Sequence, residues 1–183
     1  EMSSLKGCLQ NKHHPDNAYE HSFNALSCLE DVFDDSSNFP DDIKKGLQQI
    51  IPSRNHSLLK FAILIHDVGK PHTRTVDDAG DFHFYSHEKK SAELSDIITK
   101  RLRFSNNDQR YVHHIISNHM KPLFLFLAHR NNRLTPKAIN RFFLKSNGYV
   151  MDILIHAMAD MKAKGAHPDT GEFITFSQTL MAS

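Results

Sequence analysis

Histidine and aspartate residues at a few positions have the types and surroundings that metal-assisted chemistry requires. The pair His66-Asp67 follows residues 58–65, a run that is apolar on nearly all sides. A charged carboxylate beside such a run is costly unless it is paired with a cation or bound to a metal. The alternative interpretation is a polar cap at the end of a helix, and for an isolated His-Asp pair that interpretation is the commoner one.

Three other segments each present one more candidate ligand from an apolar setting. His21 lies beside the apolar side of its expected helix, and His119 continues an apolar stripe at helical spacing that begins at Val112. Asp160 follows the apolar run that begins at Ile153. Imidazole and carboxylate ligands without thiolate suit a divalent ion such as Mn, Fe, Ni, Co, Zn or Mg. The sequence therefore predicts a metal site where four helices converge.

The elements that must position these residues are helices. Glycine and proline number seven each, and the long stretches free of both show helical periodicity. Residues 73–76 and 82–85, on either side of a turn, predict a small β-hairpin inserted between two helices. The expected fold class is therefore all-α, a helical bundle with a small β-hairpin insertion. We expect helices at about 17–33, 41–50, 56–68, 86–104, 106–119, 135–146 and 149–164, with a further helix near the C-terminus.

Two of these helices begin with capping signals. Ser105 is followed three residues later by Asp108, and Thr135 is followed by Pro136 at the first helical position. In the helix expected at 106–119, His114 falls nearly opposite the apolar stripe. We therefore expect His114 to face solvent.

The composition limits the classes of protein to which the chain can belong. A length of 183 residues argues for one domain, and a formal net charge of +1 gives no global field that would attract nucleic acid or an anionic membrane. No apolar run approaches the roughly 20 residues that span a bilayer. The two cysteines form no CxxC pair, which argues against cysteine-bound zinc and fits a cytoplasmic location.

The order His21, His66-Asp67 and Asp160 resembles the motif of the HD-domain phosphohydrolase superfamily. The resemblance implies a single HD phosphohydrolase domain over residues 1–183, with a core at about 15–165 and a C-terminal extension at 166–183. Four further segments, in the same order and at similar spacing, resemble the HD domain of bacterial CCA-adding tRNA nucleotidyltransferases: residues 11–22, 66–74, 84–88 and 101–106.

The resemblance also implies metal-binding roles. The first ion would be held by His21, His66, Asp67 and Asp160. A second ion would be held by His87 and His119, with Asp67 as the bridge. Two-metal members of the superfamily often have two successive histidines where this chain has Asn118-His119. We therefore expect one tightly bound ion and at most a weak second one.

The expected reaction is the hydrolysis of a phosphate ester. A divalent ion lowers the pKa of bound water and polarises a phosphoryl oxygen. Asp67 would orient the water, and Lys70 or Arg74 would stabilise the added negative charge. His87, if it binds no second ion, would protonate the leaving oxygen. Lys70 and Arg74 follow the metal-binding segment and would bind the phosphate, the alternative being that both are ordinary solvated basic residues.

The resemblance implies a nucleotide or an RNA terminus as substrate, including 2′,3′-cyclic phosphates. It also implies that the chain is joined to a nucleotidyltransferase domain in a longer parent protein. A homodimer is a further compatible partner, and no membrane partner is expected. One rival function is a non-catalytic tRNA-binding module; the other is hydrolysis of free nucleotides in a nucleotide pool or in signalling. The tRNA-binding surface would be basic and formed by Lys121, Arg130, Arg133, Lys137, Arg141 and Lys145.

Overall fold

The computed structural model describes residues 1–9, 17–34, 53–165 and 167–182. Within these ranges 71% of the residues are helical, and the strands form one small antiparallel hairpin. The all-α fold class predicted from the sequence is confirmed. The helix expected at 41–50 lies outside the described residues. No described helix has the length and apolar character needed to cross a membrane.

The remaining predicted helices and the predicted hairpin are all present among the described residues. The segment near the C-terminus, expected as an extension, forms α11, whose buried Phe173 joins the core. The elements in chain order are α1 (Met2–Leu5), α2 (Ala18–Asp34), α4 (Ser53–Ile65), α5 (Lys70–Thr73), β1 (Arg74–Val76), β2 (Phe82–Phe84), α6 (His87–Arg101), α7 (Asn106–Asn118), α8 (Lys121–Arg130), α9 (Pro136–Lys145), α10 (Val150–Lys162) and α11 (Thr170–Met181).

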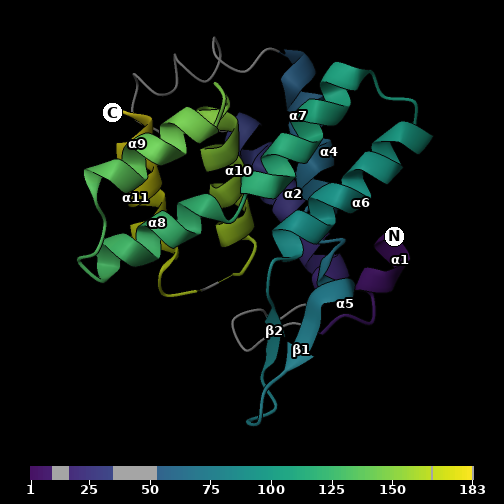
Figure 1. Cartoon of the computed structure of the whole chain (residues 1–183), viewed down its shortest axis with the longest axis horizontal. Coiled ribbons are helices and arrows are strands. Elements are labelled where there is room, and N and C mark those ends of the chain that lie inside the picture. Colours follow the sequence, from purple (N-terminus) through teal and green to yellow (C-terminus); the bar gives the residue numbers. More distant parts are fainter. Residues whose placement is uncertain (10–16, 35–52, 166, 183) are drawn as a thin grey trace.

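The helices of the bundle form two groups with α10 between them. Helices α6 and α7 lie side by side at one end, α8, α9 and α11 lie at the other, and α10 lies between them (Figure 1). Helix α4 contacts α2, α7 and α10, as the nearly all-apolar residues 58–65 predict for a helix inside a bundle. The hairpin projects from the end of the molecule that carries α5 (Figure 1).

The capping signals have the predicted effect. The Ser105 hydroxyl accepts a hydrogen bond from the Asp108 backbone N–H and donates one to the Asp108 carboxylate. The Thr135 hydroxyl accepts a hydrogen bond from the Ala138 backbone N–H. Both caps satisfy N–H groups that have no partner within the helix, so α7 and α9 begin where the sequence predicts.

Helix α4 ends earlier than the sequence predicts. Its last residue is Ile65, so His66 and Asp67 lie in the turn after the helix rather than on its last turn. The chain turns tightly here, because the Val68 N–H donates to the Ile65 carbonyl and the Lys70 N–H donates to the Asp67 carbonyl. This turn frees both side chains of His66-Asp67 from the constraint that neighbouring helical residues point about 100° apart.

Gly69 allows this turn to approach the first turns of α6. The Gly69 N–H donates to Ser91 Oγ at 2.9 Å. A Cβ atom at position 69 would lie 2.5 Å from the Ser91 backbone nitrogen and 2.7 Å from the His87 carbonyl oxygen. Because those neighbours are backbone atoms of a packed helix, a side chain at this position would push α6 away from the turn.

Helix α8 is the one described helix longer than a single turn that the sequence does not predict; the four-residue helices α1 and α5 are also absent from the prediction. Its residues 121–130 include Pro122 in the first turn, which is compatible with a helix start but also typical of a loop. Residues 122–128 are all apolar, so no polar face marks a helical period.

We expect Gly69→Ala to lower the free energy of unfolding by about 1–3 kcal/mol, the usual cost of overpacking. Chemical denaturation followed by circular dichroism measures it. Gly171→Ala is the matched control: an added Cβ there meets no heavy atom within 4 Å. It should leave stability unchanged or raise it by up to about 1 kcal/mol. Equal stability of the two variants would contradict the close approach at Gly69.

Candidate metal centre

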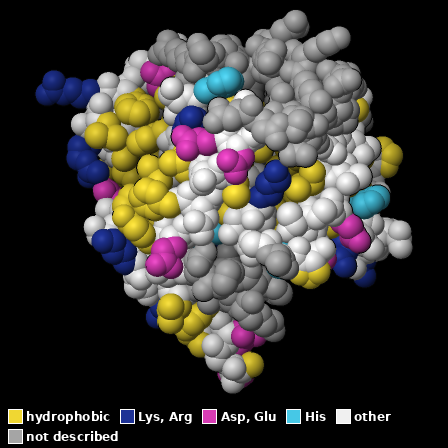
Figure 2. Space-filling model, turned by 180° about the vertical axis from the view of Figure 1, so that it is seen from behind, with side chains coloured by type: hydrophobic (Ala, Val, Ile, Leu, Met, Phe, Trp, Pro, Cys, Tyr) yellow, Lys and Arg dark blue, Asp and Glu magenta, His cyan; other side chains and the backbone are white. Residues whose placement is uncertain are grey.

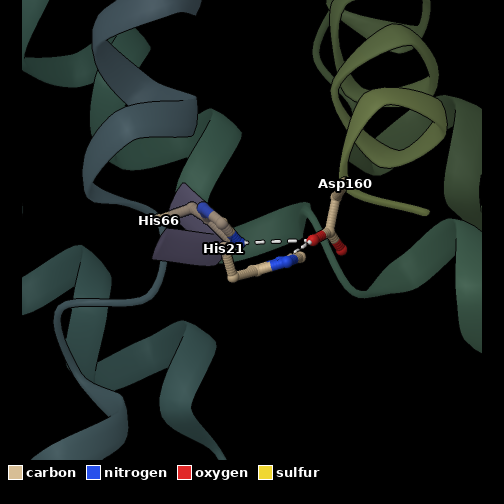
Figure 3. Close-up of side chains that lie close together, drawn as sticks. All are labelled: His21, His66 and Asp160. Atoms are coloured by element: carbon tan, nitrogen blue, oxygen red, sulfur yellow. Dashed lines mark hydrogen bonds and ion pairs between the residues drawn. The ribbon is translucent and has the colours of Figure 1, made fainter. Parts of the chain in front are cut away.

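Residues far apart in the sequence meet in the middle of the bundle. His21 comes from α2, Asp160 from α10, and His66 directly follows α4. His21 Nε2 lies 2.7 Å from Asp160 Oδ1, and His66 Nε2 lies 3.4 Å from the same oxygen. Both imidazoles point toward this carboxylate (Figure 3). Asp67 Oδ2 lies 3.2 Å from His66 Nε2 and 4.0 Å from His21 Nε2, so the structure brings together all four residues expected to hold the first ion.

The two histidines expected at a second ion lie next to each other and close to Asp67. His87 is the first residue of α6, and His119 directly follows α7. His87 Nε2 lies 3.4 Å from Asp67 Oδ1 and 3.3 Å from His119 Nε2. One carboxylate therefore has one oxygen toward His66 and the other toward His87, which is the arrangement that a bridging ligand requires.

Three of these histidines are oriented by the backbone. The Nδ1 atoms of His66, His87 and His119 lie 2.6, 2.9 and 2.7 Å from the carbonyl oxygens of residues 63, 84 and 116, respectively. A carbonyl can only accept a hydrogen bond, so each Nδ1 carries the proton. Each Nε2 is then directed toward Asp67 or its partners. Backbone anchoring of the outer ring nitrogen is typical of metal-binding histidines.

Both carboxylates are held in the ionised form. Burial alone would raise the pKa of Asp67, but the His66 imidazolium and the Lys70 ammonium hold it well below its usual range. Burial would also raise the pKa of Asp160, but hydrogen bonds from His21 and His66 hold it well below its usual range. The centre therefore contains two buried negative charges.

The charge state differs among the histidines. Burial would lower the pKa of His66, yet the Asp67 carboxylate and the hydrogen bond to Asp160 raise it to about 10. Burial lowers the pKa of His87 and holds the pKa of His119 well below its usual range. Without an ion, His66 carries the positive charge beside the carboxylates, while His87 and His119 are neutral and able to act as ligands.

The centre fits a divalent ion. Both oxygens of Asp67 are buried and neither accepts a hydrogen bond of good geometry from any described residue, although Lys70 Nζ forms an ion pair with Oδ2 at 2.7 Å. Imidazole nitrogens and carboxylate oxygens without thiolate suit the divalent ions that the sequence predicts. Two sets of three side chains have ligand atoms all within 4.8 Å of one another: His21, His66 and Asp160, and His66, Asp67 and His119.

His156 is a neighbour of the centre to which the sequence analysis gives no role. It lies one turn before Asp160 on α10 and is fully buried. Its ring centroid lies 5.3 Å from that of His66 and 5.6 Å from that of His119. Neither ring nitrogen has a hydrogen-bond partner among the described residues, and burial lowers the pKa of His156 to about 3. The four-residue spacing from Asp160 is the signal that could have drawn attention to it.

A cleft of about 670 Å³ leads from the centre to the surface. His66, Asp67 and Asp160 lie along it together with two lysines, the expected Lys70 and the unexpected Lys164. Arg74, expected to bind phosphate, is not among the described residues that line this cleft. It is exposed at the start of β1, with its guanidinium 4.9 Å from the centre of the Phe82 ring.

His114 differs from its expected position. It is half-buried rather than facing solvent, and its Nε2 donates to the Ser146 carbonyl at 3.0 Å. The loop after α9 covers this side of α7, which helical periodicity within α7 cannot reveal. Asn118 is buried, and its side-chain amide donates to the His114 carbonyl at 2.6 Å.

Metal binding at neutral pH should release at least one proton. His66 has a pKa of about 10 in the ion-free protein and must lose its Nε2 proton to become a ligand. The apparent metal affinity should therefore rise by about tenfold per pH unit from neutral pH toward pH 10. Titration calorimetry in two buffers of different ionisation enthalpy counts the protons. No proton release would exclude His66 as a ligand.

Two curated proteins are similar to this chain in sequence. An A-adding tRNA nucleotidyltransferase of Deinococcus radiodurans is 35% identical over 139 residues, which cover 74% of this chain and 30% of that protein. A CC-adding tRNA nucleotidyltransferase of Thermus thermophilus is 33% identical over 105 residues, which cover 57% of this chain and 22% of that protein. The chain thus spans less than a third of the length of either relative.

The HD domain family matches residues 18–141. This stretch contains His21, His66-Asp67, His87 and His119, and it ends before Asp160. The match covers more than half of the chain, and the described part of the chain has the all-helical architecture expected for the family. The chain therefore belongs to the HD domain family.

Proposed function

We propose that the chain is a metal-dependent phosphohydrolase acting on phosphate esters of nucleotides or on RNA 3′ ends, including 2′,3′-cyclic phosphates. Membership of the HD domain family supports the metal-dependent phosphohydrolase superfamily. The observation that supports hydrolysis most directly is Asp67. It is an ionised carboxylate, 1% exposed, with both oxygens short of hydrogen-bond donors, and it lies on an open cleft.

The proposed ligands of the first ion are His21, His66, Asp67 and Asp160, as at the sequence level. Their nitrogen and oxygen atoms already approach one another, so an ion would need little rearrangement beyond loss of the protons that His66 and His21 direct to Asp160. When bound, a divalent ion supplies a lowered pKa of water and polarisation of a phosphoryl oxygen. The second set, His87 and His119 with Asp67 between them, is proposed as the weaker site.

Asp67 and Lys70 have proposed roles in the reaction. A carboxylate oxygen of Asp67 would accept a hydrogen bond from the attacking water and thereby orient it toward phosphorus. Lys70 Nζ lies 2.7 Å from Asp67 Oδ2, so its charge is placed beside the reacting group. That charge would stabilise the negative charge that accumulates on the phosphoryl oxygens.

His87 is better suited to binding an ion than to donating a proton. Its Nδ1 proton is directed to the Phe84 carbonyl, and its lowered pKa leaves Nε2 without a proton at neutral pH. The sequence leaves both roles open at this position, a ligand of the second ion or, without that ion, a general acid. The geometry instead favours a ligand, and it leaves protonation of the leaving oxygen to solvent or to another group on the cleft.

Hydrolysis is preferred to a non-catalytic tRNA-binding module. The named activities of the two relatives belong to proteins more than three times as long as their matched segments, so they do not by themselves assign tRNA binding to this chain. On the face shown in Figure 2, the Lys and Arg side chains of the described residues are scattered among acidic and apolar ones. Attachment to a nucleotidyltransferase domain in a longer protein remains part of the proposal.

The activity assay compares kcat/KM for a 2′,3′-cyclic nucleotide, a deoxynucleoside 5′-monophosphate and an aryl phosphate under one metal ion. We expect the cyclic nucleotide to be the best substrate. A deoxynucleoside monophosphate favoured by more than about tenfold, roughly 1.4 kcal/mol of transition-state discrimination, would indicate the nucleotide-pool function instead. No turnover with any divalent ion would favour the non-catalytic tRNA-binding module.

Asp67→Ala should abolish turnover and remove bound metal while leaving the protein folded, because the core around it is aliphatic and aromatic. Elemental analysis after gel filtration measures the metal, and circular dichroism checks the fold. We expect about one equivalent in the wild type. Arg74→Ala, outside the cleft, is the control and should keep its metal. Two equivalents that survive washing with a chelator would show that Asn118 does not weaken the second site.

A further inference from the structure

Helix α8 has two apolar faces. One face is buried in the core through Pro122, Leu125 and Phe126. The other consists of Met120, Leu123, Phe124 and Leu127, at spacing i, i+3, i+4 and i+7, and all four residues line the cleft that leads from the metal centre. Phe124 and Leu127 remain 56% and 42% exposed. We refer to these four residues as the α8 stripe.

The hairpin contributes an aromatic side chain to the same cleft. Tyr85 directly follows β2 and is 71% exposed, although it is a large aromatic residue. One side of its ring stacks on the His83 ring, with centroids 5.4 Å apart and planes within 8° of parallel. His83 is held in turn by Asp77, because its Nε2 lies 2.8 Å from Asp77 Oδ2. The Tyr85 ring is thus supported on one side, and most of the remainder of its surface is open to solvent.

Apolar and aromatic surface that is exposed beside a polar centre is typical of a ligand site. The buried part of the cleft holds the histidines and carboxylates, and the exposed part holds Tyr85 and the α8 stripe. A substrate whose phosphate reaches the metal centre would place the rest of the molecule along this exposed part. The volume of about 670 Å³ is in the range of sites that bind molecules of nucleotide size.

We propose that Tyr85 and the α8 stripe form a subsite for the nucleobase of the substrate. This inference rests on the proposed function. It adds a binding site for the base, which the metal centre itself does not contact. A base offers a flat π-face to a supported aromatic ring and a polar edge to solvent, whereas an alkyl chain has no face to stack. Any base can stack on an aromatic ring. The subsite therefore favours substrates that carry a base over those that lack one, without preference for a particular base.

The test uses two 5′-phosphate esters that differ only in the base, adenosine 5′-monophosphate and ribose 5-phosphate, with the metal-loaded full chain. Tyr85→Ala and Phe124→Ala should each lower kcat/KM for adenosine 5′-monophosphate by about tenfold or more, in line with the loss of one stacking contact. Both variants should leave kcat/KM for ribose 5-phosphate within about twofold. Tyr85→Phe keeps the ring and should behave as the wild type. Leu144→Ala, which removes an 83% exposed side chain on α9, should change neither substrate.

A second measurement is independent of turnover. Adenosine has no phosphate and is not hydrolysed, so its dissociation constant for the metal-loaded protein can be measured directly by saturation-transfer NMR. Binding that weakens about tenfold in Tyr85→Ala supports the subsite even if no ester is hydrolysed, in which case only the proposed hydrolase function fails. If Tyr85→Ala lowers kcat/KM equally for both esters, or for neither, the subsite is overturned while the hydrolase function stands. Absence of adenosine binding together with equal use of the two esters would also overturn it.

Discussion

The burial of the ionised Asp67 carboxylate is the constraint on which the rest of the centre depends. With 1% exposure, Asp67 cannot be stabilised by water, and an unpaired charge in such a position costs several kcal/mol. Cationic and imidazole side chains from different elements surround this carboxylate: His66 from the same turn, Lys70 from α5, and His87 from α6. The packing of these elements therefore determines the chemistry of the centre.

Helix ends orient two of the imidazoles. The last carbonyl groups of a helix lack intrahelical partners, and two of them here accept hydrogen bonds from imidazole. The Ile63 carbonyl, in the last turn of α4, accepts a hydrogen bond from His66 Nδ1. The Ile116 carbonyl, in the last turn of α7, accepts one from His119 Nδ1. Each bond satisfies a carbonyl group and directs an Nε2 toward the carboxylates. His66 and His119 thus lie directly after helix ends, and Gly69 allows the turn after α4 to pack closely against α6.

The sequence predicts what depends on local pattern and on residue chemistry. His21 and Asp160 could be found because each lies on the apolar side of a periodic helix, and Ser105 and Thr135 because a cap needs only neighbouring residues. What it missed depends on contacts between elements. His114 is covered by the loop after α9, and Arg74 turns toward Phe82 rather than toward the cleft. His156 lies beside His66 because α10 packs against α4, and its four-residue spacing from Asp160 is a local signal that does not reveal this contact.

The failure to predict α8 has a different cause, which bears on function. Sequence periodicity detects a helix by the contrast between an apolar core face and a polar solvent face. Helix α8 lacks that contrast because Phe126 and its neighbours face the core while Phe124 and its neighbours face the cleft. A helix that keeps a second apolar face against solvent gives up solubility without gaining core packing, so that face needs another occupant. The local rule thus fails at the element that, in our proposal, contacts the substrate, as expected where a binding requirement competes with a folding requirement.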